Sequence, residues 1–190
     1  MDTVFTTDRL LVRRWTAEDV EEAYEIYRDP QVTAFLGDGR PMADTAAQRR
    51  MIDRILASYL DWDGMGSWAI QRREDDILLG AVLLKPLPDS TGDSALVEVG
   101  WHLASAHWGY GYATEAARGA LDLGWRHYGR SEIYAVVNPA NHRSQAVARR
   151  LGMSQLARTT RFYGVELDLF RLARPAAATP AAAGSVQPHP

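Results

Sequence analysis

Two glycines precede a helix-forming stretch in the run HWGYGYATEA, which starts at His107. The N-terminus of a helix presents unpaired backbone N–H groups and the positive end of the helix dipole, so it attracts anions. Gly109 and Gly111 let the backbone come close to an anion and adopt positive φ angles. Ala113 keeps the helix start narrow, and Thr114 adds a hydroxyl group. The run therefore predicts a cradle for a pyrophosphate group, with an ordinary glycine-rich turn as the alternative.

Two common phosphate-binding motifs do not match this run. A P-loop needs a lysine directly after its last glycine, and no lysine stands there. A dinucleotide-binding fingerprint needs a third glycine where Thr114 stands, and an acidic residue at the end of the next strand. That strand is expected to end in Val136, Val137 and Asn138, without an acid. The cradle therefore belongs to neither of these two classes.

The elements that would position the cradle follow from hydrophobic spacing. Alternation over 96–103 predicts a strand just before the cradle, with Glu98 and His102 on the face opposite its apolar residues. Elsewhere, apolar residues at intervals of three and four predict helices, and short apolar runs predict strands. We expect helices over 16–29, 45–62, 113–127 and 141–151, and strands over 9–15, 67–73, 78–87, 96–103, 133–137, 155–161 and 167–172. This order predicts a single α+β domain.

Composition limits the class of protein. The chain has 190 residues, of which 46% are hydrophobic, enough for one domain with a buried core. A net charge of −3 favours neither nucleic acid nor an anionic membrane as partner, and no apolar run approaches the ~20 residues of a membrane span. The absence of cysteine excludes disulfides, thiolate catalysis and cysteine-based zinc sites, and the five histidines form no metal-ligand pattern. We expect a cytoplasmic protein without a metal, with one domain over 1–172 and a disordered tail rich in alanine and proline over 173–190.

Longer motifs resemble a known family. The run VEVGWHLASAHWGYGYATEA, followed by NPANHRSQAVARRLGM, is similar to the GCN5-related N-acetyltransferases (GNAT), and specifically to the branch of ribosomal-protein alanine N-acetyltransferases. The runs TTDRLLVRRW and SWAI match the opening and middle strands of that branch, so the resemblance covers roughly residues 6–172. The wider family usually begins its phosphate loop with glutamine or arginine. Trp108 stands at that position, as is common within the branch.

The resemblance implies a mixed, mainly antiparallel sheet flanked by helices, with two splayed parallel strands over 96–103 and 133–137. Acetyl-CoA would bind between these strands, its pyrophosphate in the cradle and its pantetheine arm along the free strand edge. Asn138 and Asn141 would reach the same arm, with a turn and a helix N-cap as their alternative roles. Arg143, Arg149 and Arg150 would screen the ribose phosphate or else form a solvated helix face. The expected contacts to acetyl-CoA are Val99, Trp101, Leu103, Trp108, Gly109, Tyr110, Gly111, Tyr112, Ala113, Thr114, Asn138, Asn141 and Arg150.

Acetyl transfer needs a neutral amine, a polarised thioester carbonyl and a proton for the leaving thiolate. We expect Glu98 to be the general base, acting through water, with an ordinary solvent-facing strand residue as the alternative. Ser144 is the candidate to protonate the thiolate, with helix packing or capping as its alternative, and Tyr163 is a weaker candidate acid. Backbone amides over 99–101 would polarise the carbonyl.

The acceptor stays open at this point. Protein N-termini, small-molecule amines and antibiotics are all used by similar proteins, and a terminal α-amino group loses its proton more readily than a lysine. The expected lining of the acceptor cleft is Trp62, Trp68, Tyr27, Phe35 and the loop 37–41, with core packing as the alternative for Trp68 and Tyr27. A succinyl or other acyl donor, a CoA-binding regulatory module without turnover, and a homodimer are alternatives that the residues leave open.

Overall fold

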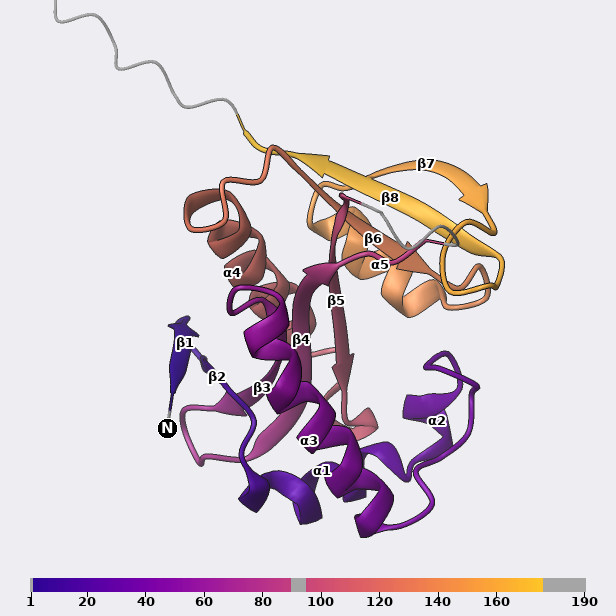
Figure 1. Cartoon of the computed structure of the whole chain (residues 1–190). Helices are drawn as coiled ribbons and strands as arrows, with labels where there is room; N and C mark the ends of the chain where they lie inside the picture. Colours follow the sequence, from indigo (N-terminus) through magenta and orange to yellow (C-terminus); the bar gives the residue numbers. More distant parts are fainter. Residues whose placement is uncertain (1, 90–94, 176–190) are drawn as a thin grey trace, which may run out of the picture.

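The computed structural model describes residues 2–89 and 95–175, which form one mixed sheet of eight strands (Figure 1). Every neighbouring pair of strands is antiparallel except β5 and β6, which run parallel. In sheet order the strands are β1 (Thr3–Thr6), β2 (Leu10–Arg13), β3 (Gly66–Arg72), β4 (Leu78–Pro86), β5 (Val97–Leu103), β6 (Glu132–Val137), β8 (Leu167–Ala173) and β7 (Ser154–Thr159). The predicted α+β class is confirmed.

Helices cover both faces of the sheet. The α-helices are α1 (Val20–Tyr27), α2 (Pro30–Thr33), α3 (Thr45–Asp61), α4 (Tyr112–Arg126) and α5 (His142–Arg150), and the short 3₁₀ helices are η1 (Ala17–Asp19) and η2 (Ser105–His107). In Figure 1, α1 and α3 cross in front of β3 and β4, and α4 lies behind the sheet. The Thr16 capping box and the Asp44 N-cap begin the first two predicted helices where the sequence indicates.

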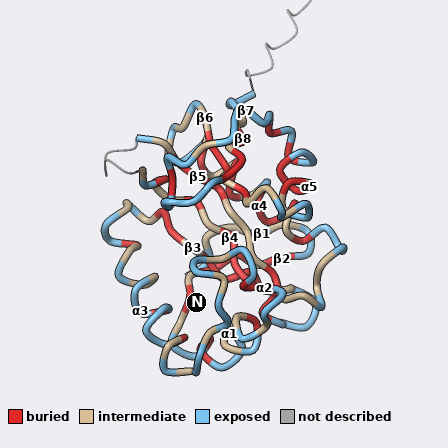
Figure 2. The backbone as a smooth tube through the Cα atoms, turned by 90° about the vertical axis from the view of Figure 1, so that its right-hand side faces the viewer, coloured by how far each residue is buried: buried red, intermediate tan, exposed pale blue. Residues whose placement is uncertain are grey.

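The core lies between α4 and the sheet. Ala116, Ala117 and Ala120 are fully buried against the strands, because small side chains let the helix approach closely. Trp68 of β3 is also fully buried, so it packs in the core and does not line an acceptor cleft. Buried residues follow the strands through the middle of the molecule, while the outer helix faces are exposed (Figure 2). None of the helices formed by residues 2–89 and 95–175 has the length and apolar composition needed to cross a membrane.

The parallel strands β5 and β6 diverge after a single register position, Glu98 opposite Tyr134. On its other side, β5 pairs with β4 along its whole length, from Val97 opposite Pro86 to Leu103 opposite Gly80. Beyond Glu98, the β6-side edge of β5 therefore keeps backbone N–H and C=O groups that none of the eight described strands pairs. This is the splayed pair that the family resemblance implies.

Two elements at the start of the chain were not predicted. The sequence analysis did not assign the short edge strand β1, and it treated Asp29–Pro30 only as a helix end. α1 does end at Tyr27, but Pro30 begins α2, since proline suits the first turn of a helix and Asp29 Oδ1 accepts a hydrogen bond from Gln31 N at 2.8 Å. β8 runs to Ala173, one residue past the expected end of the domain, and the predicted disordered tail lies almost entirely outside the described residues.

Gly80 sits where β4 approaches β5 most closely. Its φ is +145°, and a Cβ atom would lie 2.1 Å from the His102 carbonyl oxygen. We therefore expect Gly80→Ala to lower the free energy of unfolding by at least about 2 kcal/mol, measured from urea midpoints. Gly129→Ala is the matched control, because its φ is also positive, at +62°, with nothing within 4 Å, so it should cost only about 1 kcal/mol. Equal midpoints for the two variants would contradict the close contact.

Candidate active site

The loop before α4 has the backbone geometry of an anion cradle. Gly109 and Gly111 adopt φ angles of 87° and 85°, and Gly111 is the N-cap of α4 in the left-handed region. Apart from its chain neighbours, no atom of residues 2–89 and 95–175 lies within 4 Å of a Cβ built on Gly109, and a Cβ on Gly111 would only touch Arg9 Nη2 at 3.5 Å. These glycines are therefore needed for their φ angles and not for lack of space. The N–H groups of the first turn of α4 point into the space in front of the loop. The loop thus has the geometry to hold an anionic group such as a phosphate.

Glu115 in the first turn of α4 fixes this loop to the turn between β1 and β2. Its carboxylate accepts hydrogen bonds from Thr7 Oγ1 at 2.5 Å, from Arg9 N at 3.0 Å and from Arg9 Nε at 2.7 Å. Arg9 Nη1 also donates to the Tyr110 carbonyl at 3.0 Å. Burial raises the pKa of the Glu115 carboxyl, but the bonds from Thr7 and Arg9 outweigh it, so the net pKa is lowered. Thr7 and Arg9 are site residues that the sequence reasoning missed, since 106 or more positions separate them from Glu115.

Trp108 closes the turn that precedes the cradle. Its indole Nε1 donates to the Leu103 carbonyl at 2.8 Å, so the last residue of β5 and the start of the loop are held together. The guanidinium of Arg143 lies 4.6 Å from the centre of the indole ring, a cation–π contact from α5. Trp108 therefore gives the loop a packed anchor.

The start of α5 lies on the other side of the cradle. Asn141 is the N-cap of α5, and its Oδ1 accepts a hydrogen bond from Ser144 N at 3.1 Å. Asn138 Oδ1 instead accepts from Ala140 N at 2.9 Å, which stabilises the turn after β6. The capping and turn roles that were left as alternatives are therefore both observed, and Ser144 is held in the first turn of α5.

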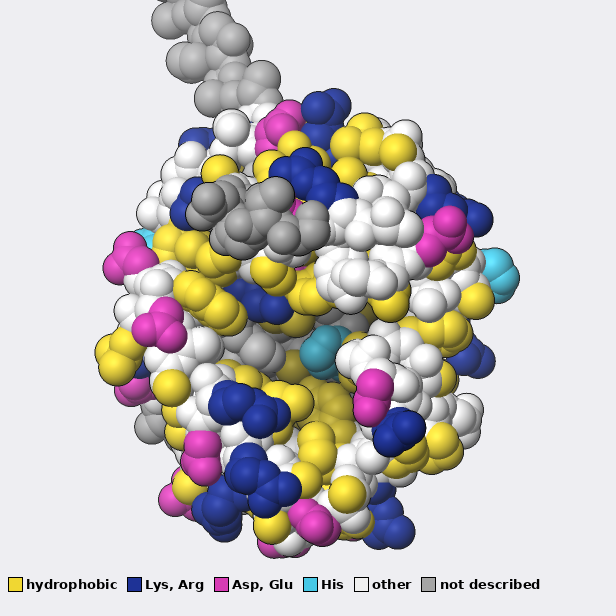
Figure 3. Space-filling model, turned by 45° about the vertical axis from the view of Figure 1, so that its right-hand side comes forward, with side chains coloured by type: hydrophobic (Ala, Val, Ile, Leu, Met, Phe, Trp, Pro, Cys, Tyr) yellow, Lys and Arg dark blue, Asp and Glu magenta, His cyan; other side chains and the backbone are white. Residues whose placement is uncertain are grey.

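A cavity of about 1180 Å³ joins these parts and extends to α2. Figure 3 shows the molecule hollowed on this side, with hydrophobic side chains and a histidine in the hollow. Of the predicted site residues, those that line the cavity are Trp101, Leu103, Trp108, Gly109, Gly111, Tyr112, Ala113, Thr114, Asn141, Ser144 and Arg150. The predicted residues that do not line it are Glu98, Val99, Tyr110 and Asn138.

Cationic side chains gather at the cradle end of the cavity. Arg118, Arg143 and Arg150 line it, and Arg118 Nη2 donates to the Arg150 carbonyl at 3.3 Å. Arg149 instead donates to Gln145 Oε1 at 3.0 Å and is not part of the lining. This charge distribution suits a ligand with several phosphates. The sequence analysis did not assign Arg118 to the site, and the proximity of α5 is what adds it.

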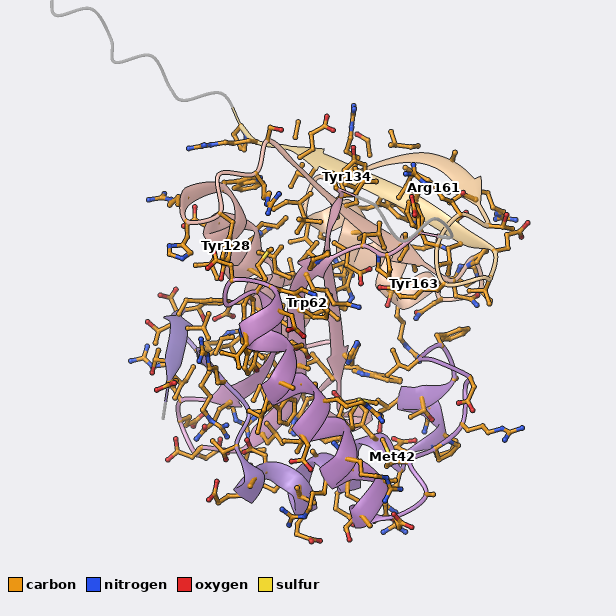
Figure 4. The ribbon with its side chains drawn as sticks, viewed as in Figure 1. Met42, Trp62, Tyr128, Tyr134, Arg161 and Tyr163 are labelled. Atoms are coloured by element: carbon orange, nitrogen blue, oxygen red, sulfur yellow. The ribbon has the colours of Figure 1, made fainter. Side chains whose placement is uncertain are left out.

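Glu98 does not have the environment of the alternative role given to it from the sequence. Only 5% of the residue is exposed, so it is not a solvent-facing strand residue. Its Oε1 accepts a hydrogen bond from the Tyr163 hydroxyl and lies 3.2 Å from Lys85 Nζ. The Lys85 ammonium also lies 3.0 Å from the Tyr163 hydroxyl and 5.9 Å from the centre of the Trp62 ring. Figure 4 labels Trp62 at the end of α3 and Tyr163 in the β7–β8 connection.

His102 lies on the same face of β5 as Glu98 and does line the cavity. Its Nδ1 is 3.3 Å from the Tyr27 hydroxyl of α1. Burial, with a smaller contribution from the Lys85 charge, lowers the pKa of His102 to about 4, so its imidazole is neutral at physiological pH. The sequence placed His102 on this face, but only the helix packing shows that it borders the site.

One hydrogen bond connects the two ends of the cavity. Ser105 Oγ of η2 donates to Asp29 Oδ2 at 2.5 Å, and Asp29 is the N-cap of α2. The bond from Ser105, and then that from Gln31 N, lowers the pKa of the Asp29 carboxyl. Of the other expected acceptor-cleft residues, Phe35 lines the cavity, whereas Trp62 and the loop 37–41 do not.

Comparison with known proteins agrees with this geometry. Residues 9–154 match the family model described as an acetyltransferase (GNAT) domain. Over 142 residues, the chain is 30% identical to an uncharacterized N-acetyltransferase, p20, of Bacillus licheniformis, covering 74% of this chain and 76% of that protein.

Solved structures share the fold. An acetyltransferase from Agrobacterium tumefaciens superposes with a TM-score of 0.74 at 24% identity, over 92% of this chain and 95% of that one. RimL, a ribosomal L7/L12 α-N-protein acetyltransferase solved with coenzyme A, superposes with a TM-score of 0.75 at 12% identity, over 90% and 98% of the two chains. The match to the family model, together with the identity to p20, shows that the chain belongs to the GNAT family and is an acyl-CoA-dependent N-acetyltransferase.

Proposed function

We propose that this enzyme binds acetyl-CoA along the free edge of β5 and transfers the acetyl group to a primary amine. The observation that carries the proposal is the continuity of one cavity with three features. These are the glycine loop at the N-terminus of α4, the unpaired edge of β5 beyond Glu98, and the wall formed by α2. The loop would hold the pyrophosphate, and Arg118, Arg143 and Arg150 would face the remaining phosphate.

The amine would approach from the face of β5 that carries Glu98. Acetyl-CoA supplies the thioester whose carbonyl carbon the amine attacks, and backbone amides over 99–101 would polarise that carbonyl. A bond forms between the amine nitrogen and the acetyl carbon, and the C–S bond breaks. Glu98 would accept the proton of the amine through water, since the carboxylate is fixed by Tyr163 and Lys85 but lies outside the cavity wall.

Ser144 would donate a proton or a hydrogen bond to the departing sulfur. It lines the cavity in the first turn of α5, where the helix dipole also favours a thiolate. Tyr163 is the weaker candidate acid, because burial, and then the neighbouring Glu98 charge, raises the pKa of its phenol well above the usual value. A phenol with a raised pKa gives up its proton less readily.

For the acceptor we propose an α-amino group, as at a protein N-terminus, with a small-molecule amine as the alternative. An α-amino group has a pKa near 7.7–8.0, whereas a lysine side chain has one near 10.4. A larger fraction of α-amino groups is therefore already neutral, and able to attack the thioester, at physiological pH. RimL, which shares the fold, is named as an α-N-protein acetyltransferase. Acetyl rather than succinyl as the donor, a cytoplasmic location and the assembly state stay predictions.

Gly111→Val tests the placement of the donor. At a φ of 85° a β-branched residue is strained, and its side chain would enter the anion space, so calorimetry should show acetyl-CoA affinity falling by on the order of a hundredfold. Gly129→Val is the matched control, since it has a similar positive φ of 62° but lies outside the cavity, and it should retain affinity. Unchanged affinity in Gly111→Val would refute the cradle, and binding without thiol release for any amine would refute the transfer reaction.

Glu98→Gln tests the proposed base. The amide can still accept from Tyr163 and Lys85, so acetyl-CoA binding should persist while the rate falls by about 10²–10⁴. The loss should be greatest at low pH, where the amine is protonated, and should shrink as the pH approaches the pKa of the amine. The readout is the pH profile of thiol release.

Ser144→Ala is the contrasting variant. It should lower the rate by a similar factor at every pH, because the leaving thiolate does not depend on the protonation of the amine. A Glu98→Gln enzyme with near-normal rates across the pH range would remove Glu98 from the mechanism.

A further inference from the structure

The face of β5 directed toward the acceptor carries an aliphatic surface between two polar residues. Glu98, Gly100 and His102 share this face, and Gly100 presents no side chain. On the neighbouring strand β4, Leu83 lies opposite Gly100. A Cβ atom built on Gly100 would lie 3.1 Å from the Leu83 side chain. The Leu83 side chain therefore covers Gly100 and makes the surface between Glu98 and His102 aliphatic, and of these residues His102 lines the cavity.

The opposing wall of the cavity is uncharged. Val32, Phe35 and Leu36, from α2 and the residues after it, line this end together with Gln31. Phe35 is 43% exposed, so its ring is accessible to a ligand in the cavity. The hydrophobic side chains in the hollow of Figure 3 agree with such an apolar wall.

His102 offers a polar contact at this wall without a charge. Tyr27 is the partner of its Nδ1, and burial raises the pKa of the Tyr27 phenol, so this hydroxyl stays protonated. When the Nδ1–H donates to Tyr27, Nε2 keeps a free lone pair. Within residues 2–89 and 95–175, no hydrogen bond from another side chain occupies that nitrogen. His102 can therefore accept a hydrogen bond from one amino group.

The carboxylates near the α2 wall that could pair with a second ammonium group on an acceptor already have partners in the protein. Glu98 is paired with Lys85, and Asp29 accepts hydrogen bonds from Ser105 and from Gln31 N. Among the described residues, the carboxylates that line the cavity are Asp8 and Glu115 at the cradle end, and Glu115 is bound by Arg9. A second ammonium group against the α2 wall would lose its hydration without gaining a partner.

We propose that the acceptor is a monoamine with an apolar group beside its amino group, which packs on Val32, Phe35 and Leu36 while His102 accepts a hydrogen bond from the amine. This assignment rests on the proposed acetyl transfer and narrows its acceptor. It includes peptides that begin with an apolar residue, and it excludes polyamines and amino sugars with several ammonium groups.

A pair of amines of equal length tests the acceptor class with the full-length enzyme and acetyl-CoA. Hexylamine and its diamine counterpart, hexamethylenediamine, differ at the far end by a second ammonium group. Thiol release should give hexylamine a kcat/KM on the order of tenfold higher or more. Peptides that begin with leucine should likewise exceed otherwise identical peptides that begin with arginine.

Phe35→Asp should reverse this preference, because it places a carboxylate in the apolar wall. Leu60→Asp is the matched control, since Leu60 is 89% exposed on α3 and lies outside the cavity, and its selectivity should equal that of the unmodified enzyme. Acetyl-CoA affinity should be unchanged in both variants, which checks that the fold and the donor site are intact.

Two substitutions of His102 separate hydrogen bonding from packing. In His102→Gln the amide oxygen can still accept from the amine, so the KM for hexylamine should stay within a few-fold. In His102→Leu the KM should rise about tenfold or more with acetyl-CoA affinity unchanged. Equal effects of the two variants would assign His102 a structural role and overturn its part in the proposal.

The outcomes distinguish this proposal from the proposed function. Preferred acetylation of the diamine, or a Phe35→Asp enzyme with unaltered selectivity, would overturn the acceptor class while leaving acetyl transfer intact. Acetyl-CoA binding with no thiol release for any of these amines would overturn the transfer reaction, and the acceptor class with it.

Discussion

The divergence of β5 from β6 is the constraint on which the site depends. Parallel strands normally satisfy their backbone groups by pairing along their full length, but these two share one register position at Glu98 and Tyr134. The sheet can tolerate this because β4 pairs with all of β5 and β8 pairs with all of β6. Each half of the sheet is thus complete without the other. The unpaired edge of β5 is available to a ligand because the rest of the sheet does not need it.

The helices α4 and α5 hold the two halves of the sheet together, one ending at β5 and the other beginning at β6. α4 packs its alanines on β4 and β5, and α5 contacts both α4 and β6. Both helices begin at the opening between the strands, so their N-termini converge there. The elements that span the split in the sheet therefore also provide its positive electrostatic potential.

How much of this the sequence could predict depended on the range of the interactions. The cradle, the α5 cap and most strands were predicted, because Gly111, Asn141 and the alternation of β5 act over a few residues. The bonds of Glu115 to Thr7 and Arg9, and the pairing of Glu98 with Lys85 and Tyr163, depend on tertiary packing and were missed.

Glu98 illustrates the difference between what local sequence predicts and what tertiary packing decides. Its position on the strand was predicted correctly, but its burial was not predicted, because the burial depends on the β7–β8 connection, which lies 65 residues away at Tyr163. His102 was likewise placed on the correct face but was assigned no role, since α1 and α2 supply its partner and the wall opposite it.

The bond between Ser105 and Asp29 has a mechanical consequence. It fixes the turn that leads into the cradle to the residue that caps α2, through a single side-chain contact of 2.5 Å. α2 is only four residues long, and this bond ties its N-terminus to η2 in addition to the packing of Val32 in the core. The loop proposed to hold the donor and the wall proposed to face the acceptor are therefore attached to each other directly, so a substitution of Ser105 or Asp29 would affect both.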